Sequence, residues 1–167
     1  MFFNVEFLLP VNCDCWRSRS KTPDSSGGWG YSGGRTDAIA FQTNGDAFLQ
    51  GYRLWGVISG STSFQVTIGL YRGSTSIATR TGSYPTSSSV KTFEVHFSQA
   101  IFLRAGVKYT ATAKVTTSSI SFRLEDGMAS ASCSGVTVTF LSSSKDSNSS
   151  NRSRGQIPAL IFRSPQC

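Results

Sequence analysis

Residues 64–70 read Phe-Gln-Val-Thr-Ile-Gly-Leu, and this stretch decides the fold class of the chain. Its apolar residues, Phe64, Val66, Ile68 and Leu70, alternate with small or polar ones. Successive side chains of a β-strand point to opposite faces of the sheet, so a period of two is typical of a strand with one buried face. The stretch therefore predicts a half-buried β-strand.

Three further stretches repeat this alternation, at residues 91–97, 107–115 and 136–140. The polar face of the second stretch consists of Lys108, Thr110, Thr112 and Lys114. Weaker strand patterns lie at residues 37–43, 48–57, 76–82, 120–125 and 157–162. Turn residues separate the strands at short, regular intervals, which gives roughly nine to eleven strands in all.

No stretch long enough for a helix carries apolar residues at helical spacing, and parallel strands need helical or similarly long crossovers. We therefore expect an all-β protein, an antiparallel, jelly-roll-like β-sandwich. The dipeptide Asn44-Gly45 suits a type I′ turn, in which both central residues have positive φ. It predicts that the strands on either side pair as a hairpin.

The chain has 167 residues, enough for one hydrophobic core. Residues 2–9 are expected to form a leading strand, and the polar segment 12–28 an exposed loop or linker. The polar run 141–155 has nothing to bury and is expected to be mobile. We divide the chain into residues 1–26 (N-terminal strand and polar linker, inside or outside the fold), residues 27–163 (the folded domain) and residues 164–167 (a tail).

The formal net charge is +7, but the basic residues are scattered, and the nearest approach to a cluster is Arg17, Arg19 and Lys21. Nucleic-acid-binding proteins concentrate such residues on one face, so we do not expect a nucleic-acid partner. No apolar run is long enough to cross a bilayer, and we expect no membrane insertion. We expect the isolated domain to be a monomer.

The four cysteines, Cys13, Cys15, Cys133 and Cys167, lack the paired spacings of a zinc site. The first residues also lack the basic start and the small-residue cleavage pattern of a signal peptide. This predicts a cytoplasmic, reducing setting, where disulfides are rare. We therefore expect free thiols, with no metal and no cofactor.

No catalytic constellation emerges. A Ser-His-Asp triad needs an imidazole beside a hydroxyl, and the only histidine, His96, is expected on an outer strand face beside Glu94. The adjacent carboxylates Glu125 and Asp126 are expected to diverge on a hydrated turn rather than to flank a substrate. We therefore predict no catalytic residue in this chain.

Aromatic residues punctuate two glycine-rich stretches, Trp-Gly-Tyr-Ser-Gly-Gly at 29–34 and Gly-Tyr-Arg-Leu-Trp-Gly at 51–56. Each ring is either core packing or a binding anchor, because exposed Trp, Tyr and Arg side chains dominate binding hot spots. The predicted partner-binding patch consists of Trp29, Tyr31, Arg35, Arg53, Trp55 and Ser61. The predicted structural glycines, where a larger residue would be damaging, are Gly30, Gly33, Gly51, Gly56 and Gly60.

Six blocks of sequence occur in the order in which a known family has them. They are Trp29-Gly-Tyr-Ser-Gly, Asp37-x-Ile-x-Phe, Gly51-Tyr-Arg-Leu-Trp-Gly, Phe64-Gln-Val-Thr-Ile, Gly106-Val-Lys-Tyr-Thr-Ala-Thr-Ala and Gly155-Gln-Ile-Pro-Ala-Leu-Ile-Phe. Together they resemble the PHR domain, named for the Pam/Highwire/Rpm giant ubiquitin ligases and also found in BTB-domain proteins. The resemblance runs from Trp29 to Phe162 and assigns residues 27–163 to that domain.

The resemblance implies an antiparallel β-sandwich that recruits proteins and does not catalyse. The Ser-rich loop from Ser142 to Ser153 and the absence of a BTB segment look more like the giant ligase than the BTB proteins. A ligase of this family carries its RING elsewhere, and the implied setting is cytoplasmic and neuronal, in axon and synapse, with the nucleus as a further site. The implied partners are ligase substrates or adaptors, in the control of axon growth and synapse formation. The alternative is a carbohydrate-binding β-sandwich module that stacks sugars on exposed rings.

Overall fold

The computed structural model describes residues 9–165 and residue 167. Strands dominate these residues, and a single 3-10 turn, η1 (Ser32–Gly34), is the only helical element among them. The twelve strands are β1 (Val11–Trp16), β2 (Asp24–Trp29), β3 (Thr36–Thr43), β4 (Ala47–Trp55), β5 (Ser61–Arg72), β6 (Thr75–Ser87), β7 (Thr92–Leu103), β8 (Tyr109–Thr116), β9 (Ser121–Arg123), β10 (Ser130–Cys133), β11 (Val136–Ser142) and β12 (Ala159–Ser164).

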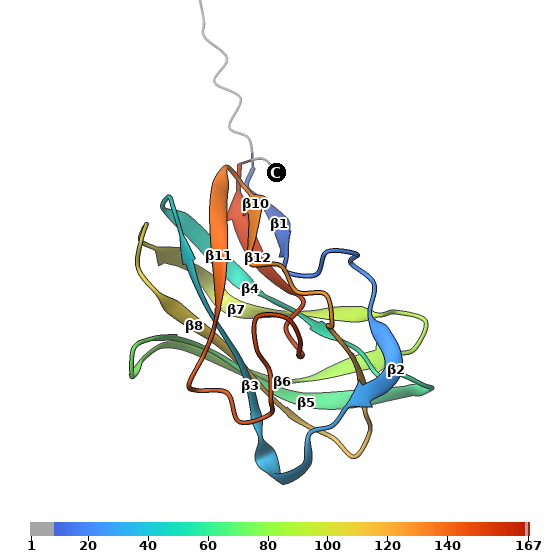
Figure 1. Ribbon diagram of the computed structural model, residues 1–167. Coiled ribbons are helices and arrows are strands. Elements are labelled where there is room, and N and C mark those ends of the chain that lie inside the picture. Colours follow the sequence, from blue (N-terminus) through green and yellow to red (C-terminus); the bar gives the residue numbers. More distant parts are fainter. Residues whose placement is uncertain (1–8, 166) are drawn as a thin grey trace, which may run out of the picture.

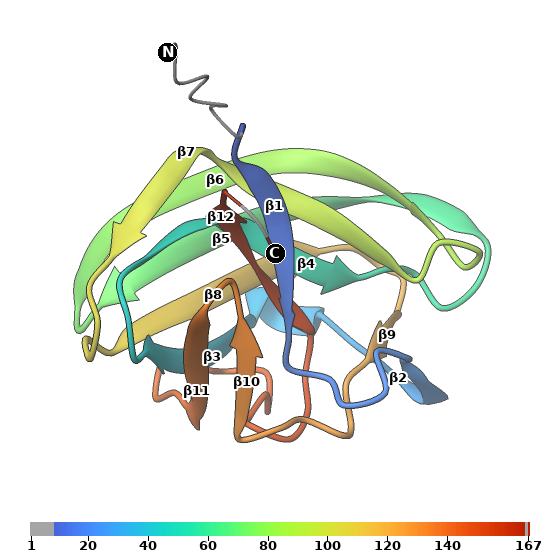
Figure 2. The same cartoon turned by 90° about the horizontal axis from the view of Figure 1, so that it is seen from above.

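Two sheets form the sandwich. One has four strands in the order β1-β12-β4-β7, and the other has six in the order β10-β11-β3-β8-β5-β6. A short pair, β2 and β9, lies at one end. All of these strand pairs are antiparallel, so the predicted all-β, antiparallel sandwich is confirmed. Figure 2 shows the long strands β5, β6 and β7 arching across the molecule.

The core lies between the two sheets and contains the apolar faces that the sequence predicts. Phe64, Val66, Ile68 and Leu70 of β5 are all buried, as are the alternating residues of β8 and β11. A hydrogen bond also crosses the sandwich, since the Tyr52 hydroxyl of β4 donates to the Gly69 carbonyl of β5 at 2.6 Å. The bond satisfies a hydroxyl that is otherwise shut away from water.

The cysteines close one side of the sandwich. The edge strand β1 of the smaller sheet lies beside the edge strand β10 of the larger one, and a disulfide joins Cys15 to Cys133 across that gap. A second disulfide joins Cys13 to Cys167. The expectation of free thiols is therefore wrong. The paired residues are 118 and 154 positions apart in the sequence, yet folding brings each pair of Cα atoms to 5.5 Å, within disulfide range.

The polar segment 12–28 is not the exposed linker that its composition predicts. Its first residues belong to β1, which pairs with β12 along its whole length. Cys13 and Cys15 face inward and are buried, while Asp14 between them faces outward and is half-buried. Cysteine thus supplies the apolar face of this strand. The predicted leading strand at 2–9 falls almost wholly outside the described residues.

The dipeptide Asn44-Gly45 does not form the predicted hairpin. The strand before it, β3, belongs to the larger sheet and the strand after it, β4, belongs to the smaller one. Neither residue has the positive φ that a type I′ turn requires. Asn44 instead extends the pairing with β11: its backbone N–H donates to the Thr137 carbonyl, and its side-chain oxygen accepts from the Thr137 N–H. The chain thereby crosses from one sheet to the other.

The segment between β11 and β12, residues 143–158, is named here the β11–β12 loop. It contains most of the polar run that the sequence predicts to be mobile with nothing to bury. Asn148, Ser150 and Gln156 are nevertheless buried, with side chains hydrogen-bonded to other elements. The expectation that this run has nothing to bury is therefore wrong, because polar side chains can be buried when each finds a partner.

Candidate functional site

The aromatic residues of the predicted patch lie in the interior. Trp29 is 8% exposed, Tyr31 5% and Trp55 0%. The Trp55 ring packs against Trp16 at a centroid distance of 6.4 Å and against Phe122. The expectation that these three rings line an exposed patch is therefore wrong, and the alternative, that they are core packing, holds. Within β4, Tyr52 and Leu54 pack in the main core, whereas Trp55 packs in a separate cluster, so both faces of this strand are covered.

The polar members of the predicted patch are not brought together. Arg35 is exposed just before β3. Arg53 points from the smaller sheet and forms salt bridges with Asp14 at 2.9 Å and Glu94 at 2.5 Å. Ser61 is exposed at the start of β5. Arg35 lines a hollow together with Trp29.

The predicted glycines divide into three kinds. A Cβ at Gly51 would overlap the Val95 carbonyl, and one at Gly56 would overlap the Thr86 hydroxyl. Gly33 and Gly60 have φ of +74° and +70°, which favours glycine. Gly30 has neither constraint, because no atom lies within 4 Å of its Cβ position and its φ is not positive.

A buried carboxylate organises the end of the molecule at which the predicted patch begins. Asp37 of β3 is fully buried. Its Oδ1 accepts from Trp29 Nε1 at 2.8 Å and from the Ser150 hydroxyl, and its Oδ2 accepts from Asn148 Nδ2 at 3.0 Å. Burial raises the pKa of Asp37 to about 6, although these hydrogen bonds act to lower it. One carboxylate therefore fixes both the Trp29 ring and the β11–β12 loop.

A buried guanidinium holds the same loop from the other side. Arg17 is 1% exposed, and its Nε donates to the Ile157 carbonyl at 3.1 Å. Its Nη1 donates to the carbonyls of Asn151 and Arg152 at 2.8 and 2.7 Å. Burial lowers the pKa of Arg17 to about 9, which the nearby charge of Asp37 opposes. Arg17 is therefore set apart from Arg19 and Lys21, which are both exposed.

A third polar cluster joins the loop to β4 and β9. Gln156 is fully buried, and its amide group hydrogen-bonds the Trp55 backbone, the Tyr31 hydroxyl and the Ser121 hydroxyl. Burial raises the pKa of the Tyr31 hydroxyl, so this group is neutral at physiological pH. The β11–β12 loop is thus a fixed part of the surface and has a defined shape.

A hollow of about 250 Å³ opens where this loop meets the η1 turn. We call it the apical hollow. Its lining residues are Trp29, Gly30, Ser32, Arg35, Asn148, Ser149 and Arg154. Arg35 and Arg154 are both exposed, and no carboxylate is in the lining. The hollow is therefore cationic, with a rigid floor of buried, hydrogen-bonded side chains.

Sequence reasoning missed the residues that build this end of the molecule. A signal existed for Asp37, since the alternation of β3 places it on the same inward face as Ile39 and Phe41. A carboxylate on that face requires partners. No comparable signal existed for Arg17 or Gln156, because both lie outside alternating strands and meet their partners only in the folded chain.

Among the described residues, no group of three or more His, Cys, Asp or Glu side chains is placed to hold a metal ion. His96 lies on the outer face of β7, as predicted, and its Nε2 is 2.8 Å from the Glu94 carboxylate. Glu125 pairs with Arg123 at 2.6 Å, whereas Asp126 bonds Ser18 and Ser20, so the two carboxylates diverge as predicted. Within the described part of the chain, no helix is long and apolar enough to span a membrane.

Comparison with known proteins places these features in a family. The chain is similar to BTB/POZ domain-containing protein 3 of Mus musculus, with 31% identity over 155 residues. It is also similar to BTB/POZ domain-containing protein 6 of Homo sapiens, with 32% identity over 155 residues. Each alignment covers 93% of this chain but 28% of the relative, so the chain spans less than a third of the relatives' length. The family model of the PHR domain matches residues 19–163, and the chain belongs to the PHR domain family.

Proposed function

We propose that this chain is a non-catalytic protein-interaction module, and that its partner docks at the apical hollow and along the β11–β12 loop. The observation that carries the proposal is the fixing of this loop by two buried charges, Arg17 and Asp37. A loop that is already ordered pays less conformational entropy when it binds. The exposed cations Arg35 and Arg154 are thereby presented in a set geometry.

The biological setting of the proposal comes from the family. We propose that the module recruits ligase substrates or adaptors to a longer protein, in ubiquitin-dependent control of axon growth and synapse formation. The similarity to BTB/POZ domain-containing proteins supports a parent chain with further domains. A RING-type giant ligase as that parent, a monomeric state and an axonal, synaptic or nuclear location stay predictions.

Disulfides persist mainly in oxidising environments, so the cysteine pairs bear on the compartment of this protein. The two disulfides count against the cytoplasmic setting that the sequence analysis predicts. Alkylation of the freshly isolated protein under denaturing conditions without reductant, followed by mass spectrometry, separates the two settings. Four unmodified cysteines indicate an oxidising compartment, and alkylated cysteines indicate a reducing one.

The interaction function is tested by cross-linking mass spectrometry of the domain in a neuronal lysate. We expect a protein whose cross-links gather on Lys145 and other residues of the β11–β12 loop, and whose capture is competed by excess unlabelled domain. The test variant is Arg35→Ala/Arg154→Ala, which keeps the buried network and should lose the capture. Capture that this double variant retains in full, or no competed protein at all, contradicts the proposal.

Carbohydrate binding is the second candidate, and one observation favours it. The two disulfides suit an extracellular protein, and extracellular β-sandwich modules include sugar-binding ones. The burial of Trp29, Tyr31 and Trp55 removes the exposed rings that sugar stacking requires. A glycan array separates the candidates: selective glycan binding that survives without any protein partner would favour this second function.

A further inference from the structure

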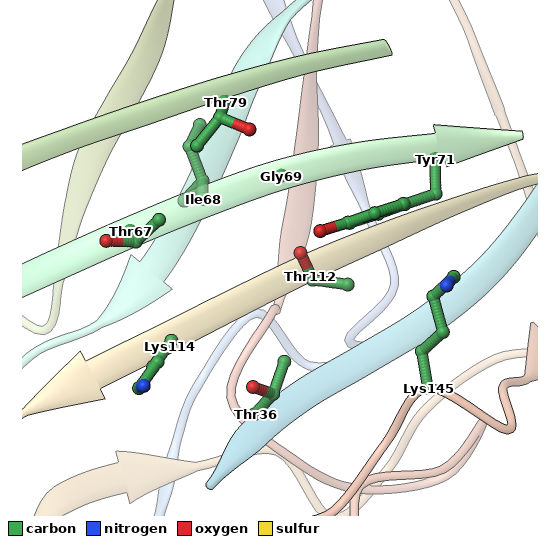
Figure 3. Close-up of a pocket in the computed structure, with 9 residues that line it drawn as sticks. All are labelled: Thr36, Thr67, Ile68, Gly69, Tyr71, Thr79, Thr112, Lys114 and Lys145. Atoms are coloured by element: carbon green, nitrogen blue, oxygen red, sulfur yellow. The ribbon is translucent and has the colours of Figure 1, made fainter. Parts of the chain in front are cut away.

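The outer face of the larger sheet carries a second hollow, remote from the buried aromatic residues. Figure 3 shows it over β5 and β8, with Thr36 on one side and Thr79 on the other. Its volume is about 320 Å³. Gly69 forms part of its floor: a Cβ there would lie 2.7 Å from the Thr112 hydroxyl and 3.0 Å from the Tyr71 ring. A side chain at this position would therefore collide with Thr112 and Tyr71, so glycine is required for this floor to keep its shape.

The β11–β12 loop borders this hollow and a further one beside it. The second hollow, of about 450 Å³, is lined by Gly73, Ser74, Lys108, Thr110, Ser143, Ser144 and Lys145. Lys145 lines both hollows, so they adjoin at this residue. We call the two together the lysine trough, after Lys108, Lys114 and Lys145. Threonine and serine hydroxyls make up most of the remaining lining.

The trough is positive and its charge is not neutralised locally. No carboxylate lines either hollow. Lys108 and Lys114 are exposed, and none of the three lysines forms a salt bridge with a described residue. Asp146 is the neighbouring acid, but its carboxylate accepts from the backbone N–H groups of Ala38 and Asn148. The outer face of the smaller sheet differs, because Arg53 there is paired with two acids.

The aromatic residue in the trough is not available for sugar stacking. Tyr71 lies along the sheet with its hydroxyl toward Thr112 (Figure 3). The Lys145 ammonium lies 4.4 Å from the centroid of the Tyr71 ring and covers one face by a cation–π contact. Sugar-binding sites of β-sandwiches commonly use an open ring, and this ring is occupied. The arrangement instead offers ammonium groups and hydroxyl donors, which suit an anion.

We propose that the lysine trough binds an extended acidic segment of the partner protein, one that carries several carboxylates or phosphorylated side chains. This rests on the proposed function and adds the chemistry of the partner. The lysines supply positive charge, and the hydroxyls of Thr36, Thr67 and Thr112 can donate hydrogen bonds to carboxylate or phosphoryl oxygens. Two adjoining hollows suit a segment that runs along the loop better than a single small anion.

The experiment measures binding of fluorescent peptides by polarisation at low ionic strength. The probes are a glutamate-rich peptide, the same peptide with phosphoserine in place of glutamate, and the same peptide with glutamine in place of glutamate. The test variant is Lys108→Gln/Lys114→Gln/Lys145→Gln. The matched control, Arg19→Gln/Arg80→Gln/Arg163→Gln, removes three positive charges from exposed residues outside both hollows.

We expect the acidic or phosphorylated peptide to bind the wild-type domain and the glutamine peptide not to bind. The lysine triple variant should lose about tenfold or more in affinity, and the arginine control much less. Raising the salt from about 0.1 M to about 1 M should weaken binding, since the screening length falls to about 3 Å. Unchanged melting temperatures show that both variants fold.

Other outcomes overturn the inference. Equal losses in the two triple variants would mean that net charge attracts the peptide with no specific site. Binding of a heparin oligosaccharide, but of neither acidic peptide, would identify a sulfated glycan as the ligand. If neither acidic peptide binds while the lysate partner is still captured at the apical hollow, this inference fails alone and the proposed function stands.

Discussion

Asp37 places an ionisable group in the core, and this makes the stability of the domain depend on pH. Burial raises its pKa from 3.8 to about 6, so the folded state holds the proton more tightly than the unfolded state. The stability that Asp37 contributes is then full below its unfolded pKa and is lost as the pH rises through about 6. The size of this contribution is about 3 kcal/mol.

We predict that Asp37→Asn flattens the dependence of unfolding free energy on pH between about 4 and 6.5. Urea unfolding at a series of pH values measures it. Asp46→Asn is the control, because Asp46 is exposed and accepts only from the Ala105 backbone. The prediction fails if the slope of stability against pH in this range is the same for Asp37→Asn and the wild type.

Trp55 is a packing residue, so its truncation should lower the unfolding free energy of the domain rather than remove a direct contact with a partner. It is fully buried against Trp16, Phe122 and Leu124. Trp55→Ala should destabilise the domain by about 3–5 kcal/mol. Chemical denaturation checks this, with Arg35→Ala as the exposed counterpart that should leave stability within about 0.5 kcal/mol. If Trp55→Ala melts at the wild-type temperature, Trp55 is not a packing residue and is again a candidate for contact with the partner.

Gly51 and Gly30 are both predicted structural glycines, but only Gly51 is closely packed. A Cβ at Gly51 would overlap the Val95 carbonyl and lie 2.8 Å from the His96 Cα, both on the neighbouring β7. Gly51→Ala should therefore cost about 1–3 kcal/mol through overpacking. Gly30→Ala should be tolerated, since its Cβ position is open. Thermal melts of the two single variants measure this difference. Equal melting temperatures would contradict the conclusion that Gly51 is closely packed and Gly30 is not.

At the scale of elements, β1 depends on a covalent link for its attachment to the larger sheet. It pairs with β12 on one side only, and Cys15 joins it to Cys133 of β10. Removal of a native disulfide typically costs about 2–4 kcal/mol. We predict that Cys15→Ala/Cys133→Ala lowers the unfolding free energy by that amount, measured in urea without reductant.

A second variant isolates the contribution of this link. Cys13→Ala/Cys167→Ala removes the disulfide that ties the tail to β1 and leaves the two sheets joined. Hydrogen exchange should then stay slow in β10 of this variant and become fast in β10 of Cys15→Ala/Cys133→Ala. Slow exchange in β10 of both variants would show that the disulfide between the sheets does not hold this edge.

The sequence predicts central strands well and edge elements poorly. In β5 and β8, one buried face imposes strict alternation, and the pattern is visible without any knowledge of partners. The edge strands β1 and β10 are short and polar, and cysteine replaces the usual apolar residues in β1. The turn at Asn44-Gly45 has hairpin composition, but the positions of β3 and β4 in different sheets depend on the whole arrangement.

At the scale of the whole molecule, the candidate site could be predicted only in part. Alternation alone groups Lys108, Thr110, Thr112 and Lys114 on one face, and the structure places all four in the lysine trough. The third lysine, Lys145, comes from a loop of low complexity, and its position requires the fold. The prediction for Trp29, Tyr31 and Trp55 is wrong because Trp, Tyr and Arg close together in the sequence are typical of a binding hot spot. Whether such rings are buried depends on the segments that cover them, which only the fold shows.

The pairing of β1 with β12 has a consequence for how this module can be built into larger proteins. Val11 lies opposite Ser164, so the chain enters and leaves the sandwich at one pole (Figure 1). A host protein could accommodate the whole unit inside one of its surface loops with little disturbance. Circular permutants that fuse the old ends and open the chain at the exposed Gly73-Ser74 turn should keep the same architecture.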